Sequence, residues 1–247
     1  YYLMLYSAKD TDKIFQMVMG WDVDGVIAIS FSKSNCEKIY QLINKPIVSI
    51  DAYGELDAGQ ESHVLNIGLD DESGGYLMTK YLLECGYEHI QVCAGRDNGV
   101  DHLRYMGAQR AAREFAGKKQ KVQFTALGMN YAKRKESYAW LIQRKKPKTA
   151  LFFLSDLYAL EAISFFSSRG VKIPEEIGIA GYDNISYAEF SVPRLTTVSQ
   201  NVEQKASLAV EILMERINGE DKERENEIRL PVTLITRKSV QRQDEKK

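Results

Sequence analysis

Short apolar runs rich in β-branched and aromatic residues alternate along the chain with stretches of helical period. The runs are residues 1–6, 25–30, 46–50, 63–69, 89–94, 122–127, 150–154 and 177–180. Continuous apolar strands of this kind are typical of parallel sheets buried on both faces. The amphipathic stretches between them are residues 12–19, 35–43, 72–85, 105–116, 133–144, 156–168 and 201–217. The alternation predicts an α/β fold with doubly wound parallel sheets and right-handed crossovers.

The end of the chain departs from this alternation. The charged run DKERENE (221–227) follows the last helical stretch and precedes the β-rich segment RLPVTLITRKSV. A run of mixed charges predicts a solvated loop or a frayed helix end. We expect the polar tail, residues 241–247, to be disordered.

Composition and charge narrow the functional classes. The 247 residues are 44% hydrophobic, which predicts a globular protein, and 33 basic residues balance 34 acidic ones. This balance gives no broad attraction to phosphate backbones, so the chain alone is a poor candidate for binding DNA. The three cysteines, without a CxxC pair, fit a reducing compartment and hence the cytoplasm. We expect neither a secretion signal nor a membrane anchor, because no apolar run approaches about 18 residues.

The usual signatures of enzyme and metal sites are missing from the sequence. There is no GxGxxG after a strand, no GxxxxGK[ST], no GxSxG and no HExxH. The three histidines lie far apart, and no Cys or His has metal-ligand spacing. We therefore expect no metal and no cofactor. The pair Gly74-Gly75 at a helix start could hold an anion, but close packing of the helix on a strand is the favoured interpretation.

Polar residues follow three of the predicted strands. Asp51 closes PIVSID, Asp183 closes IGIAGYD, and Ser155-Asp156 closes TALFFLSD. In open α/β sheets, ligands bind at this carboxyl edge. The alternative is structural: Asp156 would N-cap its helix, and Asp183 would make an Asx-turn. For Asp51 the capping alternative is weaker, because no helix follows directly.

Two further residues are candidates for ligand contacts. Arg104, at the entrance of a helix, could donate to a ligand hydroxyl or carboxylate, or could be a surface arginine paired with Asp97 or Asp101. Tyr131, in the loop GMNYAK, could stack on a sugar ring or be a partly buried loop aromatic. The position of each residue leaves both alternatives open.

Several long segments carry a resemblance to a known family. The segments are LDDESGGYLMTKYLLECGYEHIQV, RYMGAQRA, the block of residues 147–200 and the closing pattern LPxxLxxRxS. In order and spacing they resemble the effector-binding domain of the LacI/GalR family of bacterial transcriptional regulators. The resemblance covers nearly the whole chain.

The resemblance implies a type I periplasmic-binding-protein-like fold of two α/β lobes joined by three crossover segments. The N-terminal lobe would comprise residues 1–69 and 200–228, and the C-terminal lobe residues 70–199 and 229–240. TTVSQ (196–200) would be a hinge segment. The family's domain opens with a further strand and helix, so we expect residues upstream of Tyr1 in the folded molecule. A helix-turn-helix head would lie further upstream.

Residue by residue, the resemblance implies effector contacts for Asp51, Arg104 and Asp183. Ser155 stands where the family more often has Asn, and Gln200 lies at the hinge, where it would touch ligand or line the crossing. The implied protein is a homodimeric regulator that does no chemistry. It would bind a small polar effector, a sugar or sugar derivative, between its lobes and control operator DNA through the head.

Two other functions remain open at this point. One is a periplasmic sugar-binding protein of a transporter. The other is an α/β enzyme with Asp51 or Asp183 as general base.

Overall fold

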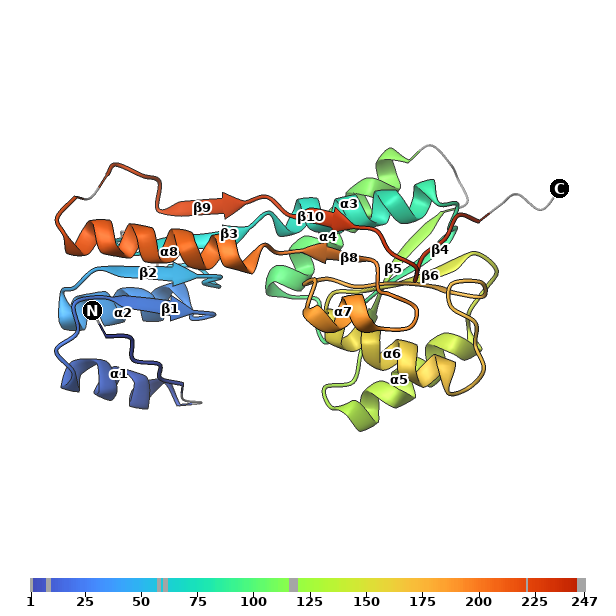
Figure 1. The fold of residues 1–247 in the computed structure, drawn as a ribbon, viewed down its shortest axis with the longest axis horizontal. Helices are drawn as coiled ribbons and strands as arrows, with labels where there is room; N and C mark the ends of the chain where they lie inside the picture. The colour runs from blue at the N-terminus through green and yellow to red at the C-terminus, as the bar shows by residue number, and fades with distance from the viewer. Residues whose placement is uncertain are drawn as a thin grey trace. The chain divides into compact units, whose positions relative to one another are not determined.

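The chain forms two compact units, each built around a parallel four-stranded sheet (Figure 1). The computed structural model describes residues 2–7, 10–56, 59, 62–115, 120–220 and 222–243. The first unit comprises Tyr1–Leu69 and Asn201–Leu230, and the second comprises Asp70–Gln200 and Pro231–Lys247. The chain therefore passes from one unit to the other three times, after residues 69, 200 and 230.

The sheet of the first unit has the order β1-β2-β3-β9, with all neighbours parallel. Its strands are β1 Val26–Ile29, β2 Ile47–Ile50, β3 Leu65–Leu69 and β9 Glu227–Leu230, and its helices are α1 Thr11–Gly20, α2 Lys33–Ile43 and α8 Val202–Ile217. Helix α8 packs on β1, β2 and β3, while α1 packs on α2 and α2 on β2. The buried side chains of α1, α2 and the neighbouring strands form one apolar cluster, which includes Val18, Ile39 and Ile47.

The sheet of the second unit has the order β5-β4-β6-β7, again parallel. Its strands are β4 His89–Ala94, β5 Lys121–Ala126, β6 Thr149–Phe153 and β7 Gly178–Ala180; β8 Thr197–Ser199 and β10 Thr233–Ile235 form an antiparallel pair beside it. Its helices are α3 Asp71–Glu84, α4 Gly99–Glu114, α5 Tyr131–Gln143, α6 Asp156–Ser167 and the short α7 Ser186–Phe190. Leu151, Phe153 and Phe166 lie at the centre of its apolar core, with no exposed surface. The α/β fold with doubly wound parallel sheets, predicted from the alternation, is confirmed.

Helices α3 and α4 approach each other closely at two glycines. A Cβ atom on Gly75 would lie 1.8 Å from the carbonyl oxygen of Arg104, and one on Gly107 would lie 1.8 Å from that of Glu72. A Cβ on Gly74 would lie 2.3 Å from the Tyr182 hydroxyl. The close-packing interpretation of the glycine pair is therefore right, although Gly75 packs against a helix and not a strand.

The strand predicted over residues 1–6 is wrong. Residues 2–7 form neither helix nor strand, and Tyr2, Leu3 and Leu5 are exposed. An apolar run becomes a strand where a neighbouring strand and a core accept it, and these side chains reach neither. Tyr1 and residues 116, 221 and 244–247, on which parts of the predicted elements fall, lie outside the described residues.

The end of the described chain lies against the second unit. The backbone N–H of Gln243 donates to the carbonyl oxygen of Cys85 at 2.7 Å, so residues 241–243 are held against the second unit. Residues 222–226 form no helix or strand, as expected for the charged run, but Glu227 already belongs to β9. No helix in the described part of the chain is both long and apolar enough to cross a membrane.

Candidate functional site

Asp183 lies just after the carboxyl end of β7, and two of the predicted site residues donate hydrogen bonds to its carboxylate. It accepts hydrogen bonds from the Ser155 hydroxyl at 3.1 Å and from the Gln200 amide at 2.5 Å. Its own backbone N–H donates to Val198, and its φ of +120° is a conformation that L-residues rarely adopt. Burial raises the pKa of Asp183, while Arg104 and the hydrogen bond from Ser155 oppose this rise. The structure thus brings Asp183, Ser155 and Gln200 together.

Asp156, next to Ser155, is fully buried and does not cap α6. Ser155 occupies the N-cap position, and the Asp156 carboxylate accepts from the Thr197 hydroxyl at 2.6 Å and the Ile185 N–H at 3.0 Å. The capping interpretation of Asp156 is therefore wrong, because the carboxylate is turned toward the segment after β7. Burial raises its pKa to about 7, while the hydrogen bond from Thr197 lowers it.

We expect the unfolding free energy to fall as pH rises through the pKa of Asp156. A carboxyl group whose folded pKa is raised binds its proton more tightly in the folded state, so its stabilisation is full below the unfolded pKa and is lost as pH approaches 7. Between pH 5 and pH 8 this one group contributes a loss of about 2 kcal/mol. Urea unfolding of Asp156→Asn should show a flatter pH dependence over this window. An equally steep dependence in that variant would assign the effect to other groups.

Arg104 is buried within the second unit and is not a surface arginine. Its Nε donates to Asp71 Oδ1 at 2.8 Å, and its Nη1 donates to the Leu154 carbonyl oxygen at 3.0 Å. The guanidinium carbon lies 3.7 Å from the centroid of the Tyr182 ring, a cation–π contact. Asp101 is a weaker partner, with its Oδ1 3.7 Å from Nη1. Burial raises the pKa of Asp101 to about 6, although the charge of Arg104 lowers it.

Asp71 is a partner of Arg104 that the sequence analysis missed. It also accepts a hydrogen bond from the Tyr182 hydroxyl at 3.3 Å, so it joins Arg104 and Tyr182. The signal was present in the sequence, because the acidic pair Asp70-Asp71 follows the apolar run 63–69, as Asp51 follows 46–50. The place of Asp71 at the start of a helix made it resemble an ordinary first-turn acid.

Asp51, in the first unit, forms an ion pair with a lysine that the sequence analysis also missed. It follows β2, with a φ of +52°, and accepts from Lys205 Nζ at 2.6 Å. Lys205 lies on the buried face of α8, with 3% of its surface exposed. A lysine is rarely buried without a partner, but the sequence does not say which carboxylate supplies it.

Tyr131 takes no part in the hydrogen bonds around Asp183. It is the first residue of α5, it is exposed, and the Lys135 ammonium lies 5.1 Å from its ring centroid. Within the described residues, no group of His, Cys, Asp and Glu could hold a metal ion. The arrangement in the second unit therefore offers carboxylate acceptors and a guanidinium donor at one sheet edge, chemistry suited to holding hydroxyl groups.

Two parallel-sheet units with polar side chains at strand ends define a periplasmic-binding-protein-like domain. The family model described as "Periplasmic binding protein-like domain" matches residues 79–240. The chain is also 36% identical, over 180 residues, to the HTH-type transcriptional repressor PurR of Haemophilus influenzae, a match covering 70% of this chain and 53% of the relative. The chain belongs to the LacI/GalR family, as an effector-binding domain of that family. It spans about half the length of this relative.

Solved structures agree with this assignment. A periplasmic binding protein/LacI transcriptional regulator from Alkaliphilus metalliredigens, complexed with D-xylulofuranose, is 27% identical with a TM-score of 0.77, over 94% of this chain and 84% of that one. A LacI family transcriptional regulator from Enterococcus faecalis, with bound ribose, is 26% identical with a TM-score of 0.78, over 94% of this chain and 83% of that one.

Proposed function

We propose that this domain binds a sugar or sugar derivative between its two units and thereby controls operator binding by a helix-turn-helix segment of the whole protein. The observation that carries the proposal is the Asp183 carboxylate, held by Ser155 and Gln200 at a strand end. Gln200 is the last residue before the chain passes back to the first unit. A ligand on Asp183 would therefore act beside a segment that joins the units.

The charges of the cluster favour an uncharged polyhydroxy ligand over a phosphate ester. The carboxylates of Asp183 and Asp101 are offered as acceptors, while the charge of Arg104 is already matched by Asp71 at 2.8 Å. A carboxylate accepts hydrogen bonds from neighbouring hydroxyls and repels a phosphate. Structural relatives solved with ribose and with D-xylulofuranose support the same ligand class.

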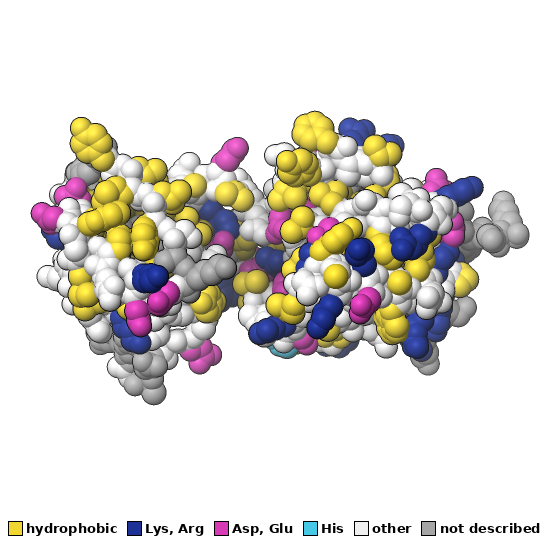
Figure 2. Space-filling model, turned by 90° about the horizontal axis from the view of Figure 1, so that it is seen from below, with side chains coloured by type: hydrophobic (Ala, Val, Ile, Leu, Met, Phe, Trp, Pro, Cys, Tyr) yellow, Lys and Arg dark blue, Asp and Glu magenta, His cyan; other side chains and the backbone are white. Residues whose placement is uncertain are grey.

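We further propose that the domain acts as a homodimer in the cytoplasm and does not transform its ligand. The exposed aromatic side chains Tyr187 and Phe190 of α7, with Val192 after it, support a contact with a second copy. Figure 2 shows hydrophobic side chains at the surface of the second unit, on the right of the view. Regulators that bind two-fold operators are dimers for reasons of symmetry. Asp51 and Tyr131 remain proposed ligand contacts.

A thermal-shift series with ribose, galactose, hypoxanthine and ribose 5-phosphate tests the ligand proposal. A sugar at 100 times its Kd should stabilise the domain by about 2.7 kcal/mol, which corresponds to a rise in Tm of about 5 to 10 °C. Ribose 5-phosphate should give a smaller shift than ribose at the same concentration.

The matched variants are Asp183→Asn and Asp97→Asn. The first removes the charge that Ser155 and Gln200 hold, and the second removes an exposed charge in the same unit, paired with His102. Asp183→Asn should lose most of the sugar-induced shift, and Asp97→Asn should keep it. A full shift in Asp183→Asn would remove Asp183 from the site.

A further inference from the structure

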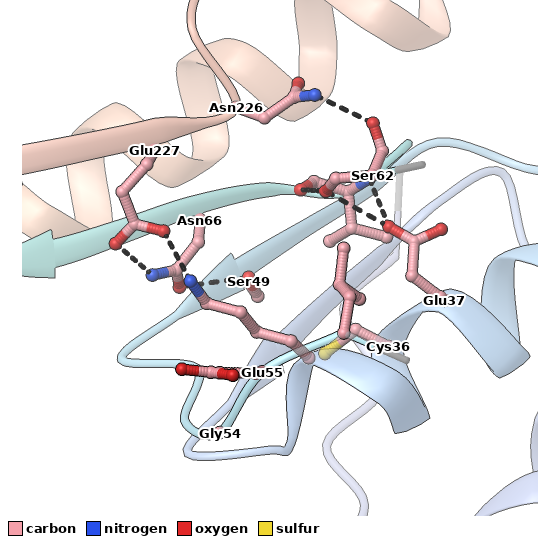
Figure 3. Close-up of a pocket in the computed structure, with 12 residues that line it drawn as sticks. Cys36, Glu37, Ser49, Gly54, Glu55, Ser62, Asn66, Asn226 and Glu227 are labelled. Atoms are coloured by element: carbon pink, nitrogen blue, oxygen red, sulfur yellow. Dashed lines mark hydrogen bonds and ion pairs between the residues drawn. The ribbon is translucent and has the colours of Figure 1, made fainter. Parts of the chain in front are cut away.

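Buried polar side chains form a cluster in each unit, and the two clusters have different roles. In the first unit the cluster borders a cavity of about 310 Å³ whose lining includes three carboxylates, those of Glu37, Glu55 and Glu227 (Figure 3). Its most buried polar groups are satisfied within the unit, because Glu37 accepts from the backbone N–H of Val64 at 3.0 Å and Asn66 donates to Glu227 at 2.9 Å. These contacts connect α2 and β9 with β3 and the residue before it, so they serve the fold of that unit.

The buried carboxylate of Asp156, in the second unit, holds a segment of unusual backbone conformation that includes Asp183. Asp183 and Asn184 have φ angles of +120° and +56°. L-residues rarely adopt such angles, and a segment that does so keeps its conformation only where its surroundings hold it. The conformation of residues 183–185 therefore depends on the groups that bind them.

Asp156 anchors the two backbone N–H groups that follow Asp183. Its Oδ2 accepts from the Ile185 N–H at 3.0 Å. Its carboxylate also accepts from the Thr197 hydroxyl at 2.6 Å, and the Thr197 oxygen accepts in turn from the Asn184 N–H at 3.3 Å. The backbone N–H of Asp156 donates to Asp183 Oδ2 at 3.4 Å. One residue thus holds both peptide groups after Asp183 and contacts the Asp183 carboxylate itself.

The neighbouring residues leave room for this carboxylate and shield it from water. A Cβ atom on Gly181 would lie 2.1 Å from Asp156 Oδ1, so a side chain at that position would displace the carboxylate. Asp156 and Thr197 are both 0% exposed. Water therefore cannot easily replace either partner if the other is removed.

Stability alone does not explain a carboxylate at this position. Burial raises the pKa of Asp156 and the neighbouring charge of Asp183 adds to the rise, although the hydrogen bond from Thr197 opposes it. The ionised group is thus buried at a cost, and its side-chain donors are neutral, a hydroxyl and a peptide N–H. Carboxyl groups perturbed in this way concentrate at functional sites.

We propose that Asp156 is a positioning residue of the ligand site, which sets the direction of the Asp183 carboxylate by holding residues 184 and 185, directly and through Thr197. The inference rests on the proposed function of Asp183, but the anchoring itself can be measured without a ligand. Asp156 makes no contact with the ligand in this role.

Amide hydrogen exchange of the full chain without ligand, followed residue by residue by NMR, tests the anchoring. Asp156→Asn leaves one acceptor oxygen in place of two and removes the charge that strengthens the hydrogen bonds. We expect the amides of Asn184 and Ile185 to exchange at least about tenfold faster than in the wild-type chain, relative to the amides of β6, which report global unfolding. Asp97→Asn, which removes an exposed carboxylate from the same unit, should change neither rate. Unchanged exchange of both amides in Asp156→Asn would overturn the proposal.

The pair Thr197→Val and Thr197→Ser tests the consequence for binding. Valine keeps the shape of threonine without its hydroxyl, so Thr197→Val should weaken ribose binding in titration calorimetry about tenfold. Thr197→Ser, which restores the hydroxyl, should recover most of the lost affinity.

Thr149→Val is the matched control for the loss of a buried hydroxyl. Thr149 is 4% exposed, and its hydroxyl oxygen accepts from the Lys146 N–H at 3.1 Å at the amino end of β6. This variant should bind ribose normally. Equal affinities in Thr197→Val and Thr149→Val would reject the role of Asp156 and Thr197. If the wild-type chain bound neither ribose nor galactose, the proposed function would fail, and amide exchange would still decide whether Asp156 holds the segment.

Discussion

Replacing Gly75 with alanine is expected to destabilise the second unit by at least about 3 kcal/mol. The added Cβ would lie 1.8 Å from the carbonyl oxygen of Arg104, which is backbone and cannot rotate away. Helices α3 and α4 would have to separate, which would also disturb the contact between Arg104 and Asp71. Urea unfolding followed by circular dichroism measures the loss.

Gly20→Ala is the matched control for this prediction. Gly20 is also a helical glycine, at the end of α1, and a Cβ there would have nothing within 4 Å. Alanine should be neutral or slightly stabilising at that position, because its helix propensity is higher. If Gly75→Ala unfolded at the same urea concentration as Gly20→Ala, the close contact of α3 with α4 would be refuted.

Replacing Arg104 with methionine is expected to cost about 3 to 5 kcal/mol, because it leaves the buried carboxylate of Asp71 without its ion pair. The side chain of Arg104 is 8% exposed, as is that of Asp71. The Leu154 carbonyl oxygen would also lose its donor. Unfolding in urea measures the cost, and adding Asp71→Asn to Arg104→Met should recover part of it, since the remaining group is then uncharged.

Arg110→Met provides the comparison on the same helix. Arg110 pairs with Glu72 at 2.7 Å, but both side chains are about two-fifths exposed. A surface ion pair of this kind contributes up to about 1 kcal/mol. If Arg104→Met and Arg110→Met lowered the free energy of unfolding equally, burial of the Arg104–Asp71 pair would make no difference to stability.

Arg104 illustrates how much of the site can be predicted from the sequence. The sequence left two alternatives, a ligand donor or a surface arginine paired with Asp97 or Asp101. The structure rejects the surface position and supplies a partner, Asp71, that lies 33 residues away in the chain. Partners this distant follow from the packing of α3 on α4, which no local pattern encodes.

The dependence on partners that are distant in the chain also explains the other differences between the sequence predictions and the structure. Residues 2–6 have the composition of a strand, yet strand formation needs a neighbour that composition does not supply. The sequence offers Asp156 as an N-cap, yet Ser155 occupies that position and the Asp156 carboxylate accepts a hydrogen bond from Thr197, 41 residues away. The ammonium of Lys205 can be buried because it forms an ion pair with Asp51, 154 residues away. In each case the deciding partner is remote in sequence.

By itself, the sequence determined the parallel α/β architecture, the positions of most helices and strands, and the placement of Ser155 and Asp183 at the carboxyl ends of predicted strands. These follow from hydrophobic period and from the rule that the carboxyl ends of parallel strands meet at one edge. Gln200 was assigned to the same region only by the resemblance to the family. Only the tertiary structure decided which charges are paired, how closely α3 approaches α4, and that a cavity with three carboxylates lies in the first unit. Those features depend on side chains that meet through space, and the free energy of a charge is set by what surrounds it.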